Sequence, residues 1–139
     1  MAPDPERVKQ VRAWIENAKE DLRAVEVDLK ADPPLVGAAG FHVQQAAEKA
    51  MKGFLAWHDR PFGKTHDLVV LANACLAVDR SLESFVPEVS PLTEYIWRSR
   101  YPGRVADELG IEEVREGEAV ARRLYAAILQ RLPPEVRVS

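Results

Sequence analysis

Hydrophobic residues in the first part of the chain recur at alternating steps of three and four, which is the spacing of one face of an α-helix. The segment ends where Asp32 is followed by two prolines, because a residue before proline is driven out of helical geometry. The pattern therefore predicts an amphipathic helix that faces its neighbours with Val8, Val11, Ile15, Ala18, Leu22, Val25 and Leu29.

Four further helices are predicted between breaks rich in proline and glycine. The second covers about residues 40–58, and the third follows Thr65, whose hydroxyl can cap its first turn. The fourth opens at Ser90 with a proline in its first helical position and is stopped by Pro102–Gly103. The last runs over about residues 111–132 with apolar residues at helical spacing.

These elements define the expected fold class. No stretch of alternating β-branched residues competes with the helices, and short breaks between helices of this length join antiparallel neighbours. At 139 residues, the chain has the length of one ordinary domain. We therefore expect an all-α fold, an up-and-down antiparallel bundle of about five helices, as a single domain over residues 1–139.

Composition narrows the classes of partner and location. With 22 acidic and 19 basic residues, the net charge of -3 argues against nucleic-acid binding through bulk charge. No apolar run is long enough to cross a bilayer, and the start of the chain lacks the pattern of a signal peptide, so we expect a cytoplasmic protein without a membrane partner. The single cysteine, Cys75, lies in an apolar run and is expected to be a buried structural thiol.

The second helix has an unusual polar side. His42, Gln45 and Lys49 share it with Glu48 and Lys52, whereas alanines and large apolar residues occupy the other side. The alanines would let the backbone of a neighbouring helix approach closely, with a glycine at residue 53 on the margin. Two interpretations of the polar side stay open: a solvated face of a core helix, or one wall of a polar groove. His42 has no partner residue at the spacing of a helical metal site, so no metal is expected.

Three blocks in chain order, "FHVQQAAEKAMKGFL", "KTHDLVVL" and "RSRYPG", resemble the HEPN domain, named from higher eukaryotes and prokaryotes nucleotide-binding. The opening and closing helices fit as well, so the resemblance covers nearly the whole chain. It implies a bundle of about five helices that is usually dimeric, hence a homodimer. It also implies a partnership with a separately encoded minimal nucleotidyltransferase, as a toxin–antitoxin pair.

In such pairs the HEPN chain is typically a ribonuclease, with an arginine followed after four to six residues by a histidine near the start of the final helix. This chain departs from that pattern, because no histidine follows His66. Arg60 and His66 have a permitted spacing but flank a loop at the wrong point of the chain, and we interpret that match as chance. Metal-free RNA cleavage needs groups that exchange protons, so we expect no catalytic residues of the usual kind and no cofactor.

The resemblance and the side-chain chemistry together suggest a site for a nucleotide or an RNA end. Arginine binds phosphate through two donors and aromatic rings stack on bases, while a lysine beside a helix N-terminus favours anions. The alternative for the arginines and aromatics near the end of the fourth helix is structural, since cations bond the last carbonyls of a helix. The predicted nucleotide-binding residues are Arg100, Tyr101, His42, Gln45, Lys49, Lys64 and His66.

The leading hypothesis is thus a HEPN-like domain that binds a nucleotide or an RNA end and acts with a nucleotidyltransferase partner, without the usual ribonuclease motif. One alternative is a ribonuclease toxin with a non-standard site that borrows His42 or His66. Another is a purely structural dimerisation module.

Overall fold

The computed structural model describes residues 3–98 and 108–137, which are helical with no β-strand among them. This confirms the all-α fold class. The α-helices are α1 (Pro5–Lys30), α2 (Val36–Trp57), α3 (Leu68–Val78), α4 (Phe85–Val89), α5 (Tyr95–Arg98) and α6 (Ile111–Gln130). Short 3-10 turns are η1 (Arg80–Leu82), η2 (Ser90–Glu94) and η4 (Pro134–Val136).

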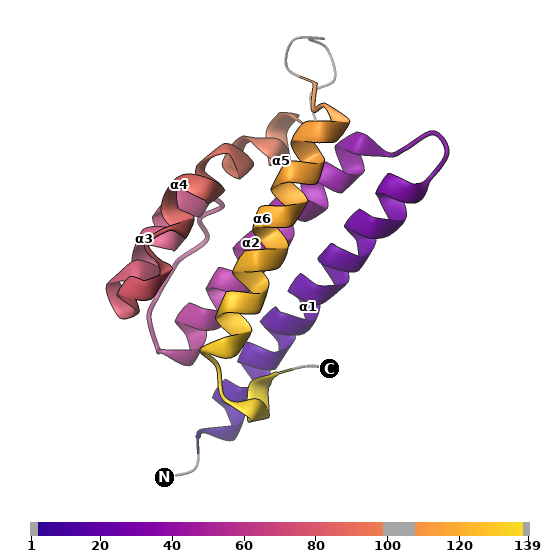
Figure 1. Ribbon diagram of the computed structural model, residues 1–139. Coiled ribbons are helices and arrows are strands. Elements are labelled where there is room, and N and C mark those ends of the chain that lie inside the picture. The colour runs from indigo at the N-terminus through magenta and orange to yellow at the C-terminus, as the bar shows by residue number, and fades with distance from the viewer. Residues whose placement is uncertain (1–2, 99–107, 138–139) are drawn as a thin grey trace.

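The helices run up and down beside one another, as predicted. Figure 1 shows α1 and α2 as an antiparallel pair, α6 alongside them, and the segment α3–α5 on the other side of the molecule. α2 packs against α1, α3, α5 and α6, so it is the central helix of the bundle. In the part of the chain that the structure describes, no helix combines the length and apolar character that a membrane crossing requires.

The predicted apolar face of α1, which we call its seam, is buried except at its two ends. Asp4 caps the helix, since its Oδ1 accepts a hydrogen bond from the Glu6 amide at 3.0 Å. Val8 and Leu29, at the two ends of the seam, are half-buried and pack against the core. The seam residues that are fully buried are Val11, Ile15, Ala18, Leu22 and Val25.

α1 and α2 approach closely at Gly53. A Cβ added there would lie 3.0 Å from Ile15 Cδ1 and 3.1 Å from Trp14 Cβ, so a larger side chain would push the helices apart. The alanines of the same helix, Ala46, Ala47 and Ala50, are buried. The expectation that small residues admit a neighbouring backbone is therefore confirmed.

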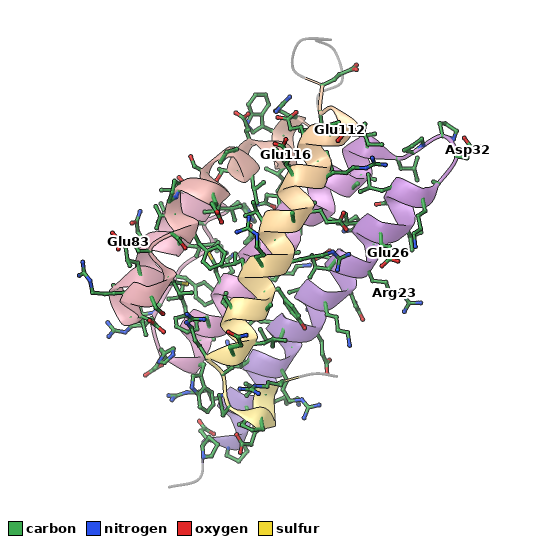
Figure 2. The ribbon with its side chains drawn as sticks, viewed as in Figure 1. Arg23, Glu26, Asp32, Glu83, Glu112 and Glu116 are labelled. Atoms are coloured by element: carbon green, nitrogen blue, oxygen red, sulfur yellow. The ribbon has the colours of Figure 1, made fainter. Side chains whose placement is uncertain are left out.

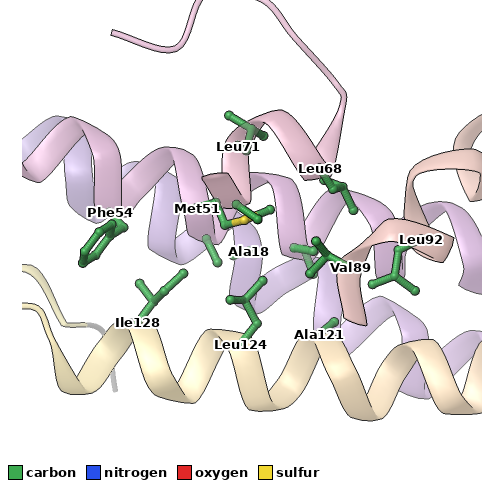
Figure 3. Close-up of a cluster of buried hydrophobic side chains, with 14 of the residues drawn as sticks. Ala18, Met51, Phe54, Leu68, Leu71, Val89, Leu92, Ala121, Leu124 and Ile128 are labelled. Carbon is green, nitrogen blue, oxygen red and sulfur yellow. The ribbon is translucent and has the colours of Figure 1, made fainter. Parts of the chain in front are cut away.

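The apolar core lies where α1, α2, α3 and α6 meet, and α4 and η2 add Val89 and Leu92 to it (Figure 3). Phe54 and Met51 of α2 are almost fully buried, as are Leu124 and Ile128 of α6. Burial of each such side chain contributes roughly 1.5–3 kcal/mol to folding. Cys75 of α3 is also buried, and burial raises the pKa of its thiol to about 12, which confirms a structural thiol.

The predicted starts of the second and third helices were wrong. α2 begins at Val36 rather than near Gly40. The glycine lies inside the helix, and Leu109 packs where a side chain of residue 40 would otherwise be. α3 is capped by Asp67 rather than Thr65. Asp67 Oδ1 accepts from the amides of Val69 and Val70, at 2.9 and 3.4 Å. The Thr65 hydroxyl instead accepts from the Asp67 amide at 3.1 Å, two residues too early to cap the helix.

The predicted fourth helix begins earlier than expected. Helical structure starts at Phe85 with α4, continues through η2 and reaches Arg98 in α5. The proline at residue 91 therefore lies inside this helical segment rather than at its start. Proline has no amide hydrogen, and the chain there adopts the tighter 3-10 form. The predicted stop at Pro102–Gly103 lies outside the described residues. α6 ends at Gln130, close to the expected 132.

Candidate functional site

The polar side of α2 is covered by other elements rather than solvated along its whole length. Glu48 and Lys52 are buried although the helical pattern placed them on the polar side, and the neighbouring Gln44 is fully buried. The polar residues on and around this helix form two hydrogen-bonded clusters, one around Asp21 and one around Glu48, and together we call them the polar band. Its members are Asp21, His42, Gln44, Gln45, Glu48, Lys49, Lys52 and His66.

One end of the polar band is organised by Asp21 of α1. Its carboxylate is buried, with Oδ1 2.8 Å from His42 Nδ1 and Oδ2 2.8 Å from Lys49 Nζ. A buried carboxylate is costly unless it is paired, and these two partners use both of its oxygens. The pairing fixes the positions of a histidine and a lysine that both come from α2.

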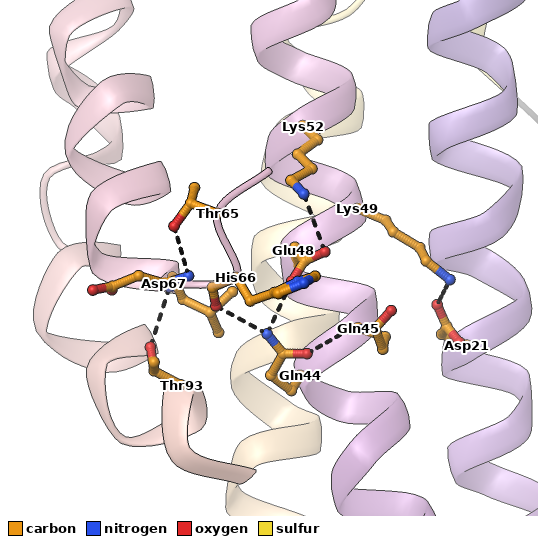
Figure 4. Close-up of polar contacts among 11 residues, drawn as sticks. Asp21, Gln44, Gln45, Glu48, Lys49, Lys52, Thr65, His66, Asp67 and Thr93 are labelled. Carbon is orange, nitrogen blue, oxygen red and sulfur yellow. Dashed lines mark hydrogen bonds and ion pairs between the residues drawn. The ribbon is translucent and has the colours of Figure 1, made fainter. Parts of the chain in front are cut away.

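The other end is organised by Glu48 of α2 (Figure 4). Glu48 Oε1 lies 2.8 Å from His66 Nδ1, and its Oε2 lies 3.3 Å from Lys52 Nζ. The Glu48 side chain is 5% exposed, whereas the His66 side chain is 63% exposed. The buried carboxylate therefore holds a histidine whose ring stands largely in solvent.

Gln44 connects this end of the polar band to the loop before α3. Its Nε2 donates to Glu48 Oε1 and to the backbone carbonyl of His66, both at 3.2 Å. Its Oε1 accepts from Gln45 Nε2 at 2.7 Å. His66 is thus held at two points, through its ring and its backbone, which fixes the orientation of the imidazole.

The ammonium group of Lys52 lies close to two aromatic rings. Its Nζ is 5.7 Å from the centroid of Trp14 and 5.5 Å from the centroid of Phe62, and the two rings contact each other edge to face at 5.9 Å. Cation–π attraction and the Glu48 carboxylate together stabilise the buried ammonium. Lys52 therefore supports the band from within rather than offering a free cation.

The charges within the polar band offset one another. The carboxylates of Asp21 and Glu48 are matched by the ammonium groups of Lys49 and Lys52. The attraction of the band for an anion consequently depends on its histidines and on cations nearby. Lys64 is one such cation, since it is exposed on the loop two residues before His66.

The structure brings four of the predicted site residues together in the polar band: His42, Gln45, Lys49 and His66. The predicted Arg100 and Tyr101 lie outside the described residues. Among the described residues, no group of three or more histidine, cysteine or acidic side chains could hold a metal ion.

The neighbouring arginine of the "RSRYPG" block has a structural role. Arg98 donates to Glu113 of α6 at 2.7 and 3.2 Å, to Glu94 at 3.3 Å and to the Glu108 carbonyl at 3.0 Å. It holds the start of α6 against the end of α5. This matches the structural interpretation of that arginine.

The predicted site residues did not include Asp21, Gln44, Glu48 or Lys52, although Glu48 and Lys52 were placed on the polar side of the second helix. A signal for Asp21 was present, because it lies three residues after Ala18 and one before Leu22, within the buried stripe of α1. An acid in such a stripe must be paired, so it predicts a cation on the facing helix. Gln44 gave no comparable signal, since it lies between the apolar and polar sides of α2.

The comparisons with known proteins agree with this architecture. The HEPN domain family matches residues 11–132 of the chain, a range that contains the whole polar band. A crystal structure of TT1696 from Thermus thermophilus is 28% identical, covering 88% of this chain and 98% of that chain, with a TM-score of 0.76. No curated protein matches this chain. The range of the family match and the helical architecture lead to one conclusion: this chain belongs to the HEPN domain family.

Proposed function

We propose that this HEPN domain binds a nucleotide or an RNA end along the polar band and acts with a minimal nucleotidyltransferase protein. The observation that carries the proposal is the pair of buried carboxylates, Asp21 and Glu48, each of which holds one histidine and one lysine in place. Such buried ionic groups rarely add stability over apolar residues of the same size. The presence of two such groups, Asp21 of α1 and Glu48 of α2, along the polar side of α2 favours a role in recognition.

The polar band offers several kinds of contact to such a ligand. The ring of His66 is largely exposed and that of His42 is 31% exposed, so both can donate to or accept from a phosphate or a base. Lys49 is partly exposed, and Lys64 adds an exposed ammonium beside His66. Fixed donors bind a ligand with little loss of side-chain freedom.

The partnership is proposed from the family resemblance of the three sequence blocks. In this proposal two copies of the chain form a homodimer in the cytoplasm, and the pair with the nucleotidyltransferase works as a toxin–antitoxin-like system. Arg100 and Tyr101 remain proposed ligand contacts.

Calorimetric titration of the purified protein with ATP, GTP and a short RNA tests ligand binding. We expect binding that weakens about tenfold in Lys64→Ala and His66→Ala, since each change removes one phosphate contact. Lys19→Ala serves as the matched control, because this lysine is exposed on α1 away from the band. Equal affinities in all four proteins would overturn the assignment of the polar band.

Co-expression with a nucleotidyltransferase encoded beside this chain tests the partnership. We expect the two chains to purify together over a range of salt concentrations. A stable dimer of this chain that neither retains the partner nor binds any nucleotide or RNA would instead indicate a structural dimerisation module.

A ribonuclease with a non-standard site is the second candidate, favoured by the contact between Glu48 and His66. A histidine oriented by a carboxylate can exchange protons with a substrate, which RNA cleavage requires. This candidate predicts RNA cleavage that is lost in His66→Ala and in Arg100→Ala. Cleavage that persists in both variants would indicate a contaminating enzyme.

A further inference from the structure

The contact between Glu48 and His66 determines which ring nitrogen of His66 carries the proton. A carboxylate only accepts hydrogen bonds, so the His66 Nδ1 at 2.8 Å from Glu48 Oε1 must be the protonated nitrogen. The neutral ring then carries its free electron pair on Nε2. No described residue is hydrogen-bonded to that Nε2, and the His66 side chain is 63% exposed.

We propose that His66 Nε2 is a nucleophile that accepts a phosphoryl group from a small phosphorylated donor, such as an acyl phosphate or a phosphoramidate. This goes beyond ligand binding, because a covalent bond forms on the protein. Its basis is the fixed tautomer, the largely exposed side chain of His66 and the buried carboxylate that contacts its Nδ1.

The step is balanced without any redox partner. With an acyl phosphate, the Nε2 electron pair attacks phosphorus and the Nε2–P bond forms. The bond between phosphorus and the acyl oxygen breaks, and the carboxylate leaves with that electron pair. With phosphoramidate the P–N bond breaks instead, and the nitrogen, which is protonated in the donor, leaves as ammonia with that electron pair. Nδ1 keeps its proton throughout, so the phosphorylated ring carries a positive charge on the imidazole.

Glu48 is placed to stabilise that charge. Its Oε1 faces His66 Nδ1, while its Oε2 is occupied by Lys52 Nζ at 3.3 Å. The second contact orients the carboxylate, as the outer partners of a reactive histidine commonly do. Gln44 holds the backbone carbonyl of His66 at 3.2 Å, which fixes the backbone that carries the ring, while the Glu48 contact at 2.8 Å holds the ring itself.

The surroundings of the ring also suit an anionic donor. Lys64 is exposed on the same loop and adds positive potential near His66. The nearby acid, Asp67, accepts hydrogen bonds at its Oδ1 from the amides of Val69 and Val70. These amides form the positive end of the α3 dipole, which partly offsets the negative charge of Asp67. The exposure of the imidazole leaves room for the donor to approach Nε2 in line.

The other histidines provide internal controls. His42 also has its Nδ1 on a buried carboxylate, Asp21, but its side chain is only 31% exposed. His58 at the end of α2 has no carboxylate hydrogen-bonded to its ring among the described residues, and its ring instead packs on Phe54 with centroids 4.6 Å apart. The proposal therefore predicts that His66 reacts fastest of the three.

The test is incubation of the purified protein with potassium phosphoramidate and, separately, with acetyl phosphate. Intact-mass and peptide mass spectrometry follow the added phosphoryl group, and phosphorus NMR identifies the nitrogen. We expect one acid-labile phosphoryl group on His66 Nε2, none at that position in His66→Asn, and about tenfold slower modification in Glu48→Gln. The rate in Lys19→Ala should equal that of the wild type.

The ranking of the three histidines within the wild-type protein keeps the test decisive even if Glu48→Gln does not fold. Modification of His66 no faster than that of His58, or attachment at Nδ1, would overturn the proposal. Ligand binding is measured separately by calorimetry, so a chain that binds nucleotide but is not phosphorylated would contradict this inference alone.

Discussion

Arg98 Nη1 lies 2.7 Å from Glu113 Oε2, and Arg98 Nη2 lies 3.2 Å from Glu113 Oε1, so the two side chains form a bidentate ion pair. The hydrogen bond from Arg98 lowers the pKa of the Glu113 carboxyl below its ordinary value. The pair joins α5 to the first turn of α6. Figure 2 labels Glu112 of that turn, at one end of the bundle. Glu113 also accepts from the Gly110 amide at 3.3 Å, which links the pair to the cap of α6.

Replacing Arg98 with methionine should lower the free energy of unfolding by about 1–2 kcal/mol, because the change removes several charge-assisted hydrogen bonds from a side chain that is 11% exposed. Urea unfolding followed by circular dichroism measures the change. Arg123→Met is the matched control, since its pair with Glu88 is more exposed and should contribute under about 1 kcal/mol. Equal losses in the two variants would contradict the structural role of Arg98.

Gly117 should not tolerate even a methyl group. A Cβ there would lie 2.9 Å from Tyr95 Cε2 and 3.0 Å from Leu92 Cδ2, so Gly117→Ala forces α6 away from η2 and α5. We expect a loss of about 1–3 kcal/mol in the free energy of unfolding. Gly110→Ala, where a Cβ would meet no atom within 4 Å, should cost less, about 0.5–1 kcal/mol, because alanine is only a poorer N-cap of α6 than glycine. Thermal unfolding measures the change, and an unchanged melting temperature in Gly117→Ala would show that Tyr95 and Leu92 can move to make room for the methyl group.

Stability should fall on mild acidification through His58. Burial, assisted by the nearby charge of Arg60, lowers the pKa of His58 below 6.5, so the unfolded chain binds more protons than the folded chain just below that pH. The contribution of His58 is complete above pH 6.5 and is lost as the pH falls through the lowered pKa. Denaturant unfolding of the wild type and His58→Gln across this window should give a shallower pH dependence in the variant. Identical slopes would assign the acid sensitivity to other groups.

Glu48 and Lys52 should show strong energetic coupling. Glu48→Gln leaves the ammonium of a lysine side chain that is 6% exposed without its carboxylate, and we expect a loss of about 3–5 kcal/mol. In Glu48→Gln/Lys52→Met the buried charge is gone, so the double variant should be more stable than the sum of the single changes predicts, by about 0.5–3 kcal/mol. Unfolding of all four proteins gives the coupling energy. Additive losses would mean that water enters and solvates Lys52.

Sequence patterns predicted the architecture well because the helices of this chain are long and strongly periodic. The seam of α1 and the small residues of α2 follow directly from spacing. Boundaries were less predictable where capping signals compete, as Thr65 and Asp67 do at the start of α3. The later of the two wins because its carboxylate reaches two amides of the first turn.

The candidate site was predictable only in part. Helical spacing places His42, Lys49 and Gln45 on one side of α2, but no local pattern shows that Glu48 on the same helix meets a histidine 18 residues later. That contact depends on how the loop before α3 returns across α2. The burial of Lys52 likewise depends on Trp14 and Phe62, which lie far from it in sequence.

The central position of α2 has a consequence for hydrogen exchange. Its backbone amides are enclosed by α1, α3, α5 and α6, so deuterium can reach most of them only when the whole bundle opens. The residues of the polar band are anchored to this helix. A ligand bound to the polar band would stabilise the closed bundle and slow amide exchange throughout α2, including turns far from the ligand. Slower exchange of these buried amides would therefore measure how much of the protein has ligand bound.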